Sequence, residues 1–243
     1  MFENSTVASD GNSIATESIN LAECSFLEYF QSPSESPLES WRYQRVKRTF
    51  DFLCSLIMIL VFAIPGLLIA AIILYTSGGP VFYREERIGR DRRPFRIWKF
   101  RSMYSDATKH ARIADMNPSG NVLEWRMQKH LQDHRITVIG RFLRCWSLDE
   151  LPQLFNVLCG EMSLIGPRPI VEAETDYYGD LLLFYLAATP GLSGLWQVSG
   201  RSHVDYAKRA RLDASYVQSW SLKSDFILLF RTVPAVLGRI GAR

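Results

Sequence analysis

A long uncharged segment constrains this chain more than any other feature. Residues 52–83 contain no Asp, Glu, Lys or Arg, and residues 52–75 are almost wholly apolar. As a helix, this stretch is long enough to cross the ~30 Å hydrocarbon core of a bilayer. Length and hydropathy alone therefore predict one transmembrane helix.

The residues on either side of this segment favour a different arrangement. Both flanks are strongly basic, and a crossing helix would leave one of them outside the cell, against the positive-inside tendency. A helix that turns back keeps both flanks in the cytosol, so we favour a re-entrant helix over a spanning one. The flanking bases are Arg42, Arg45, Lys47 and Arg48 before the segment, and Arg84, Arg87, Arg90, Arg92, Arg93, Arg96, Lys99 and Arg101 after it.

A proline near the midpoint supplies the predicted turn. Pro65 is followed by Gly66, and a proline removes one helical hydrogen bond and clashes with the carbonyl four residues earlier. Each arm of about a dozen residues rises ~18 Å, which is enough to enter one leaflet and return. Ser55 is a candidate donor to a carbonyl freed at that depth. We therefore predict a membrane helix over about residues 50–75, with its turn at Pro65.

Charge is distributed unevenly along the chain. The first 40 residues hold seven of the 25 acids and none of the 28 bases, so residues 41–243 carry 28 bases against 18 acids, a net charge of +10. Such a body suits an anionic partner, whether a phosphate ester, a nucleic acid or an acidic membrane. We predict an acidic disordered tail (1–40), a basic-flanked re-entrant membrane helix (41–80) and a cytosolic catalytic domain with interfacial helices (81–243).

The four cysteines are scattered, without a CxxC pair or a histidine at ligand spacing. This pattern argues against a zinc site and against a disulfide framework. It fits a protein whose thiols face the reducing cytosol.

The remainder of the chain predicts an α+β protein that is mainly α. Aromatic, roughly alternating runs at residues 81–83 and 94–100, separated by "GRDRRP", predict a small basic β-hairpin. Leucine and phenylalanine recur at helical spacing over residues 151–158, and Gly160 ends that helix. The other predicted segments are a loop at 117–120, helices at 176–188 and 206–220, and a helix at 225–240 that is either interfacial or packed on the soluble core.

Two adjacent carboxylates, Asp149 and Glu150 in "SLDELPQLFNV", have two readings. Ser147 followed three residues later by Glu150 has the spacing of a capping box, and acids in a first turn complement the helix dipole. Alternatively the two acids are a catalytic pair. The local pattern alone favours the helix start.

Basic residues near this pair predict a phosphate site. In Gly166-Pro167-Arg168-Pro169, two prolines restrict the backbone around one guanidinium, which suits a bidentate grip on phosphate; the alternative is a surface turn with an incidental arginine. The glycine-rich run 189–201 lets backbone approach a ligand closely, or is a simple long loop. The chain contains neither GxxxxGK[ST] nor GxGxxG. Further bases are Lys99 and Arg101 in "KFRSM", Arg135, Arg141 and Arg144 in "DHRITVIGRFLR", and Arg201.

The order of these motifs closely resembles the bacterial sugar transferase family, the monotopic polyprenyl-phosphate phosphoglycosyl transferases. The resemblance extends over roughly residues 45–232. One departure concerns the membrane turn, because many relatives place a serine before the proline where this chain has Ile64. The motifs are "KRTFDFLCS", a proline-broken apolar segment, "GGPVFYREERIG", "FRIWKFRSM", "DHRITVIGRFLR", "SLDELPQLFNVLCGEMSLIGPRP", "TPGLSGLWQVSGR" and "LDASYV".

The resemblance implies a reaction and assigns roles to residues. Such enzymes transfer a sugar-1-phosphate from a UDP-sugar, often UDP-galactose or UDP-glucose, to undecaprenyl phosphate and release UMP, with Mg²⁺. Asp149 would be the nucleophile and a metal ligand, and Glu150 would assist and share the metal. Arg168 would bind phosphate, and Lys99 and Asp213 match further polar positions of the site. Arg101, Arg141 and Arg201 complete the predicted phosphate-binding set.

The resemblance also implies a location and partners. The active site would face the cytoplasm at the bacterial inner membrane, at the first membrane step of exopolysaccharide synthesis. Partners would be membrane lipids, downstream glycosyltransferases and a second copy of the chain.

A non-catalytic membrane scaffold that binds anionic lipid is the main alternative to this enzyme. Nucleic-acid binding is disfavoured, because the bases alternate with acids and apolar residues and no helix-turn-helix or zinc pattern occurs.

Overall fold

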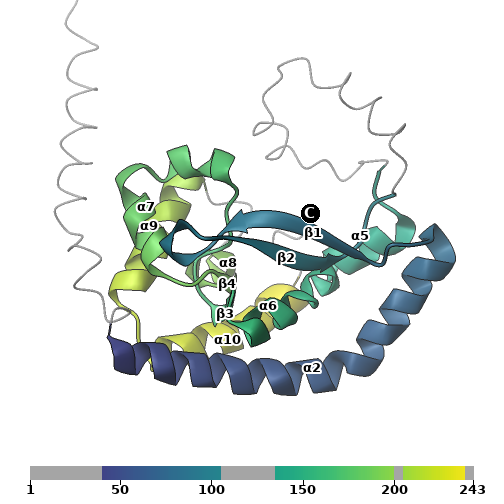
Figure 1. Cartoon of the computed structure of the whole chain (residues 1–243), viewed down its shortest axis with the longest axis horizontal. Coiled ribbons are helices and arrows are strands. Elements are labelled where there is room, and N and C mark those ends of the chain that lie inside the picture. The colour runs from purple at the N-terminus through teal and green to yellow at the C-terminus, as the bar shows by residue number, and fades with distance from the viewer. Residues whose placement is uncertain (1–39, 105–134, 200–204, 239–243) are drawn as a thin grey trace, which may run out of the picture.

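The computed structural model describes residues 40–104, 135–199 and 205–238. The predicted tail, the loop at 117–120 and Arg201 lie outside these ranges. The described part is mainly helical with two small sheets, which confirms the predicted class. The long helix α2 runs along one side of the molecule, α6 and α10 lie next to it, and the hairpin β1–β2 lies beyond them (Figure 1).

The structure's elements have the following bounds. The α-helices are α2 (Trp41–Ser77), α5 (Val138–Cys145), α6 (Gln153–Cys159), α7 (Leu182–Ala187), α8 (Leu195–Val198), α9 (Tyr206–Gln218) and α10 (Leu222–Leu237). The strands are β1 (Phe82–Ile88), β2 (Pro94–Phe100), β3 (Ser163–Ile165) and β4 (Gly191–Ser193). Short 3₁₀ turns are η3 (Arg90–Arg92), η4 (Leu148–Glu150), η5 (Glu172–Tyr177) and η6 (Gly179–Leu181).

Helix α2 contains the predicted membrane segment and is longer than predicted. It is a continuous helix of 37 residues with Pro65 inside it, and Figure 1 shows that it bends in its C-terminal part. Within it, Gln44–Ser77 contains an 18-residue window with a mean hydropathy of 3.0 and is long and apolar enough to cross a membrane. The predicted role of Ser55 was wrong, because its hydroxyl donates to the carbonyl of Phe52, 3.0 Å away, one turn earlier.

The N-terminal part of α2 is fixed to the globular body by buried polar contacts. Lys47 Nζ lies 2.6 Å from Asp225 Oδ2 of α10, and both side chains are buried. The Asp51 carboxylate accepts a hydrogen bond from the Leu164 amide at 3.1 Å. Arg48 donates to the carbonyls of Val157 and Leu158 at the C-terminal end of α6, where the last carbonyls of a helix lack their usual i+4 partners.

The C-terminal part of α2 contacts the same body. Ile69 and Ile73 pack with Phe100 of β2 and Leu143 of α5 in a small buried cluster. Arg101, directly after β2, donates to the carbonyl oxygens of residues 77–79, where α2 ends. Both ends of α2 are therefore docked on one globular body, and the large apolar side chains between them are mostly exposed.

The hairpin is confirmed, with a longer first strand than predicted. β1 and β2 pair antiparallel, with Tyr83 opposite Lys99 and Arg87 opposite Phe95. Opposite residues share a face of the ladder, and side chains alternate between faces. Tyr83, Arg87 and Lys99 therefore belong to the same face.

The parallel pair β3–β4 brings two predicted loops together. Gly166 and Gly191 pack backbone against backbone, and a Cβ on Gly191 would collide with the Gly166 amide nitrogen. A Cβ on Gly194 would collide with the Gly166 carbonyl. The glycine-rich run thus provides close approach to the Pro-Arg-Pro loop, where the sequence suggested close approach to a ligand.

The helices of the C-terminal half were predicted with mixed success. α9 is confirmed, but the single helix predicted at residues 176–188 is wrong, because η5 and η6 occupy its start and α7 begins only at Leu182. Gly179, the first residue of η6, has φ +49°, a conformation that does not continue a right-handed helix. α10 packs on the core through Leu228, which agrees with one of the two predictions for this segment, and it exposes Phe230 and Val233.

Candidate active site

The acidic pair lies in a turn of its own and not in the first turn of a long helix. Ser147 adopts φ +55° and makes no side-chain cap, so the predicted capping box is absent. Asp149 and Glu150 belong to η4, and α6 begins only after Pro152. The turn places both carboxylates beside strand β2, which is in contact with η4.

Burial and nearby charges act on the pKa of Asp149. Glu150 Oε1 lies 3.1 Å from Lys99 Nζ. Burial, and then the neighbouring Glu150 carboxylate, raise the pKa of Asp149, while Lys99 and Arg144 act to lower it. When a carboxylate is partly desolvated and close to a second carboxylate, a nearby cation or positive ligand strongly stabilises its ionised form.

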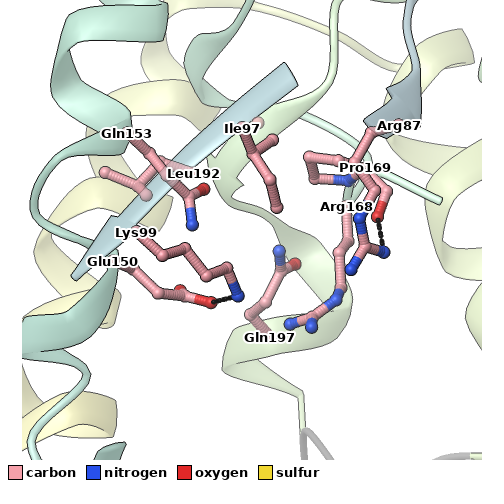
Figure 2. A pocket seen from close by; sticks show the side chains of 10 residues that line it. Arg87, Ile97, Lys99, Glu150, Gln153, Arg168, Pro169, Leu192 and Gln197 are labelled. Carbon is pink, nitrogen blue, oxygen red and sulfur yellow. Dashed lines mark hydrogen bonds and ion pairs between the residues drawn. The ribbon is translucent and has the colours of Figure 1, made fainter. Parts of the chain in front are cut away.

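A pocket opens beside this pair and joins it to the Pro-Arg-Pro loop. Figure 2 shows the Lys99–Glu150 pair on one side and Arg168 and Gln197 on the other, with Ile97 between them. The pocket therefore combines an acid, a lysine and arginines in one place. It is lined by Arg87, Ile97, Lys99, Glu150, Gln153, Arg168, Pro169, Gly191, Leu192 and Gln197.

The Arg168 loop is held from the hairpin. Arg87 Nη1 donates to the Pro169 carbonyl at 3.1 Å (Figure 2), and the Ile88 amide donates to the Ile170 carbonyl at 2.9 Å. The Arg168 guanidinium lies 5.8 Å from the centre of the Trp196 ring. Prolines on both sides, the two hydrogen bonds and the ring together restrict where this guanidinium lies.

The structure brings some predicted site residues to the pocket and not others. Lys99, Glu150 and Arg168 line it, and Asp149 adjoins Glu150. Arg101 is buried and donates to the end of α2 instead. Arg141 is exposed on α5 and does not line the pocket.

Asp213 is buried behind the pocket, in α9. Its carboxylate accepts a hydrogen bond from the Tyr178 hydroxyl at 2.9 Å. Burial raises the pKa of Asp213 to about 7, against the opposing effects of Arg209 and of the Tyr178 hydrogen bond. Because its side chain is buried in contact with Tyr178, Asp213 does not line the pocket.

Sequence reasoning missed Arg87, Gln153 and Gln197 as lining residues. Arg87 was read only as one of many flanking bases. The alternation of a strand could have identified it, because a residue four positions after Tyr83 shares the face of Lys99 once the hairpin register is known. Gln153 and Gln197 carry no comparable signal, since a single amide in a helix or a loop is common.

The carboxylates fit Mg²⁺ held partly by substrate. The described residues contain no group of three or more His, Cys, Asp or Glu side chains that could enclose a metal ion. Mg²⁺ is usually bound by one or two carboxylates together with water and substrate phosphates. Asp149 and Glu150 supply that number of carboxylates, so this pair fits an ion completed by water and substrate.

The structure thus combines an acidic pair near a lysine and an arginine with a long, largely exposed apolar helix. The model of the family "Bacterial sugar transferase" matches residues 42–239. The chain belongs to the bacterial sugar transferase family, and it is a phosphoglycosyl transferase by class.

Relatives named for exopolysaccharide production or for transfer to undecaprenyl phosphate are similar over most of this chain. The exopolysaccharide production protein ExoY of Rhizobium meliloti is 46% identical over 192 residues, which is 78% of this chain and 84% of that protein. The undecaprenyl-phosphate galactose phosphotransferase of Salmonella typhimurium is 48% identical over 198 residues, 81% of this chain but 41% of that protein. A UDP-glucose:undecaprenyl-phosphate glucose-1-phosphate transferase of Caulobacter vibrioides is 40% identical over 200 residues, 79% of this chain and 69% of that protein.

Proposed function

We propose that this protein transfers a hexose-1-phosphate from a UDP-sugar, such as UDP-galactose or UDP-glucose, to undecaprenyl phosphate and releases UMP. The reaction would be the first membrane step of exopolysaccharide synthesis. The names of the relatives support exopolysaccharide production and transfer to undecaprenyl phosphate. One observation carries the proposal: the acidic pair adjoins a pocket in which Lys99 and Arg168 supply positive charge for phosphate.

The proposed chemistry has two displacements at one phosphorus. In the first, an Asp149 carboxylate oxygen forms a bond to the β-phosphorus of the UDP-sugar, and the bond from that phosphorus to the bridging oxygen breaks, so that UMP leaves with this oxygen. In the second, a phosphate oxygen of undecaprenyl phosphate attacks the same phosphorus and the bond to Asp149 breaks. The products are UMP and undecaprenyl diphosphate sugar, and Asp149 is regenerated.

The pocket's cations make an anionic nucleophile workable. A carboxylate is repelled by phosphoryl oxygens unless their charge is balanced, and fixed arginines and lysines provide that balance without reorganisation. Arg168 is held by its prolines and by Trp196 to grip phosphate oxygens. Glu150 holds Lys99 at 3.1 Å, close to where the reacting phosphate would lie.

We propose Mg²⁺ as the cofactor, held by Asp149 and Glu150 and completed by donor phosphate oxygens. When bound, the ion would supply further neutralisation of the diphosphate and its leaving group. Asp149 and Glu150 would then orient the donor, and the raised pKa of Asp149 would fall as the positive charge approached.

The docking of α2 supports a re-entrant helix on the cytoplasmic side of the membrane. Lys47 at one end of α2 and Arg101 beside the other end both bond to the same globular body. A helix that crossed the membrane would place its two ends on opposite sides. The exposed apolar middle of α2, with Pro65 inside it, would enter one leaflet and keep the pocket near the headgroup plane, where the acceptor phosphate lies.

The membrane arrangement can be tested by labelling. In a variant without its own cysteines, Ser40→Cys and Tyr83→Cys would be treated with a membrane-impermeant maleimide. Labelling of both positions in inverted vesicles, and of neither in spheroplasts, is expected. Labelling of the two positions from opposite sides would contradict the re-entrant helix.

The reaction is tested by UMP release. The full chain in nanodiscs would receive Mg²⁺, undecaprenyl phosphate and a panel of UDP-sugars, and release with one sugar would also identify the donor. Folded protein that binds anionic vesicles but releases no UMP from any member of the panel would favour the non-catalytic scaffold.

A further inference from the structure

A buried cation behind the pocket takes no part in the proposed chemistry. Arg209 of α9 is only 6% exposed, and its Nε and Nη2 atoms are buried without a hydrogen-bond partner in the part of the chain that the structure describes. Burying a guanidinium is costly unless its charge is compensated. Its surroundings must therefore compensate it in another way.

Aromatic rings surround this guanidinium. Its central carbon lies 4.7 Å from the centre of the Trp196 ring, 5.3 Å from that of Tyr206 and 6.0 Å from that of Tyr178. A cation over an aromatic face is attracted by the electrons of the ring, most strongly over tryptophan and in a desolvated site.

Two carboxylates fix the tyrosines of this cluster. The Tyr178 hydroxyl donates to Asp213 at 2.9 Å, and the Tyr206 hydroxyl donates to Glu174 at 2.8 Å. Burial acts to raise the pKa of Glu174, but Arg209, Tyr206 and other partners lower it overall. Glu174 thus contributes negative charge near Arg209, and both carboxyl groups orient the rings that face it.

The cluster is connected to the pocket through one ring. Trp196 is 7% exposed. The guanidinium carbon of Arg209 lies 4.7 Å from the centre of its ring, and that of the pocket residue Arg168 lies 5.8 Å from the same centre. The next residue, Gln197, lines the pocket. A shift of the Trp196 ring would therefore move the contact surface of Arg168.

We propose that Arg209 is a positioning residue for the donor phosphate site: it fixes the Trp196 ring, and that ring fixes Arg168. Asp213 then acts on the site through Tyr178 and Arg209, without touching substrate. This role rests on the proposed function, because its effect is measured as binding of the UDP-sugar.

A double-mutant cycle tests the role. Arg209→Met removes the charge at similar length and is expected to raise the donor KM about tenfold with kcat nearly unchanged, as for loss of a desolvated cation–π contact. In an Arg168→Ala background the same change should alter KM less than about twofold, because the two residues act in series. Asp213→Asn should show a smaller rise that also disappears in that background. Lys208→Met, an exposed change on the same helix, is the matched control.

The results separate positioning from a structural role. An equal rise in KM in both backgrounds, or a lower Tm with unchanged KM, would overturn the inference while leaving the proposed function intact. Wild-type protein that released no UMP from any UDP-sugar would overturn both. If Arg209→Met yields no folded protein, Arg209→Lys and Trp196→Phe replace it, with the same expected loss of effect in the Arg168→Ala background.

Discussion

Two arginines that look alike in the sequence lie in opposite environments. Arg101 is buried, and its guanidinium donates to the carbonyls of residues 77–79 at the end of α2. Arg168 lies in the pocket over Trp196 and makes no hydrogen bond or ion pair with another residue in the described ranges. An arginine whose donors are occupied by backbone carbonyls has a structural role. An arginine positioned by its backbone and a ring has donors available for a ligand.

The strongest test on the pocket side is the loss of the nucleophile. Asp149→Asn should reduce UMP release at least about 1,000-fold, because an amide cannot form the proposed phosphoryl bond. Asp180→Asn, an exposed change of the same chemistry, should leave the rate near wild type. Near-normal release from Asp149→Asn would remove Asp149 from the mechanism.

The strongest test on the architectural side lies at the other end of α2. Lys47→Met leaves the buried Asp225 carboxylate without its cation, and breaking a buried pair in this way costs about 3–5 kcal/mol. Thermal unfolding in detergent should show a large fall in Tm, whereas the exposed Arg45→Met should change it little. Equal stability of the two variants would mean that Lys47 does not anchor α2.

The same alanine substitution at Arg168 and at Arg101 tests the comparison directly. Arg168→Ala should raise the donor KM roughly 10–100-fold, the loss of hydrogen bonds to a charged group, with little change in Tm. Arg101→Ala should instead lower stability by about 1–3 kcal/mol, because the buried guanidinium and its part-buried hydrogen bonds to the end of α2 are lost. Steady-state kinetics and thermal unfolding of both variants would separate the roles. A large rise in KM with unchanged Tm in Arg101→Ala would instead support the predicted phosphate-binding role of Arg101.

The smallest expected effect is a pH dependence of stability. The pKa of Asp213 is about 7 in the fold, above its ordinary value of 3.8, with Tyr178 and Arg209 as its charged or titratable neighbours. The folded state therefore keeps a proton that the unfolded state has lost, and this contribution to stability disappears as pH rises through about 7. Asp213→Asn should show a smaller fall in Tm between about pH 5 and about pH 8 than wild type. An identical pH profile for the two proteins would contradict the raised pKa.

Much of the fold follows from local patterns. Alternating aromatic residues predicted the hairpin, and Gly160, with φ +90°, ends α6 as expected. The helix predicted at 176–188 failed because Gly179 interrupts it, and the end points of α2 failed because tertiary contacts of Lys47 and Arg101 extend it in both directions. Local propensity does not contain such long-range contacts.

The residues of the candidate site also differ in how far the sequence could predict them. Short, chemically specific motifs singled out Lys99, Glu150 and Arg168, and the structure brings these three side chains to one pocket. Arg101 and Arg87 could not be assigned correctly from sequence, because which arginine faces the pocket depends on hairpin register and on the position of the end of α2. The buried position of Asp213 behind Trp196 depends on packing between α8 and α9, which no local pattern encodes.

Intact-protein mass spectrometry after incubation with the UDP-sugar and Mg²⁺, without undecaprenyl phosphate, tests the central claim most directly. The proposed mechanism predicts one UMP released per protein and a mass increase of one sugar phosphate on the Asp149 peptide, lost when undecaprenyl phosphate is added and absent in Asp149→Asn. UMP release that strictly requires the acceptor, with no adduct on the protein, would show direct transfer and contradict the Asp149 intermediate.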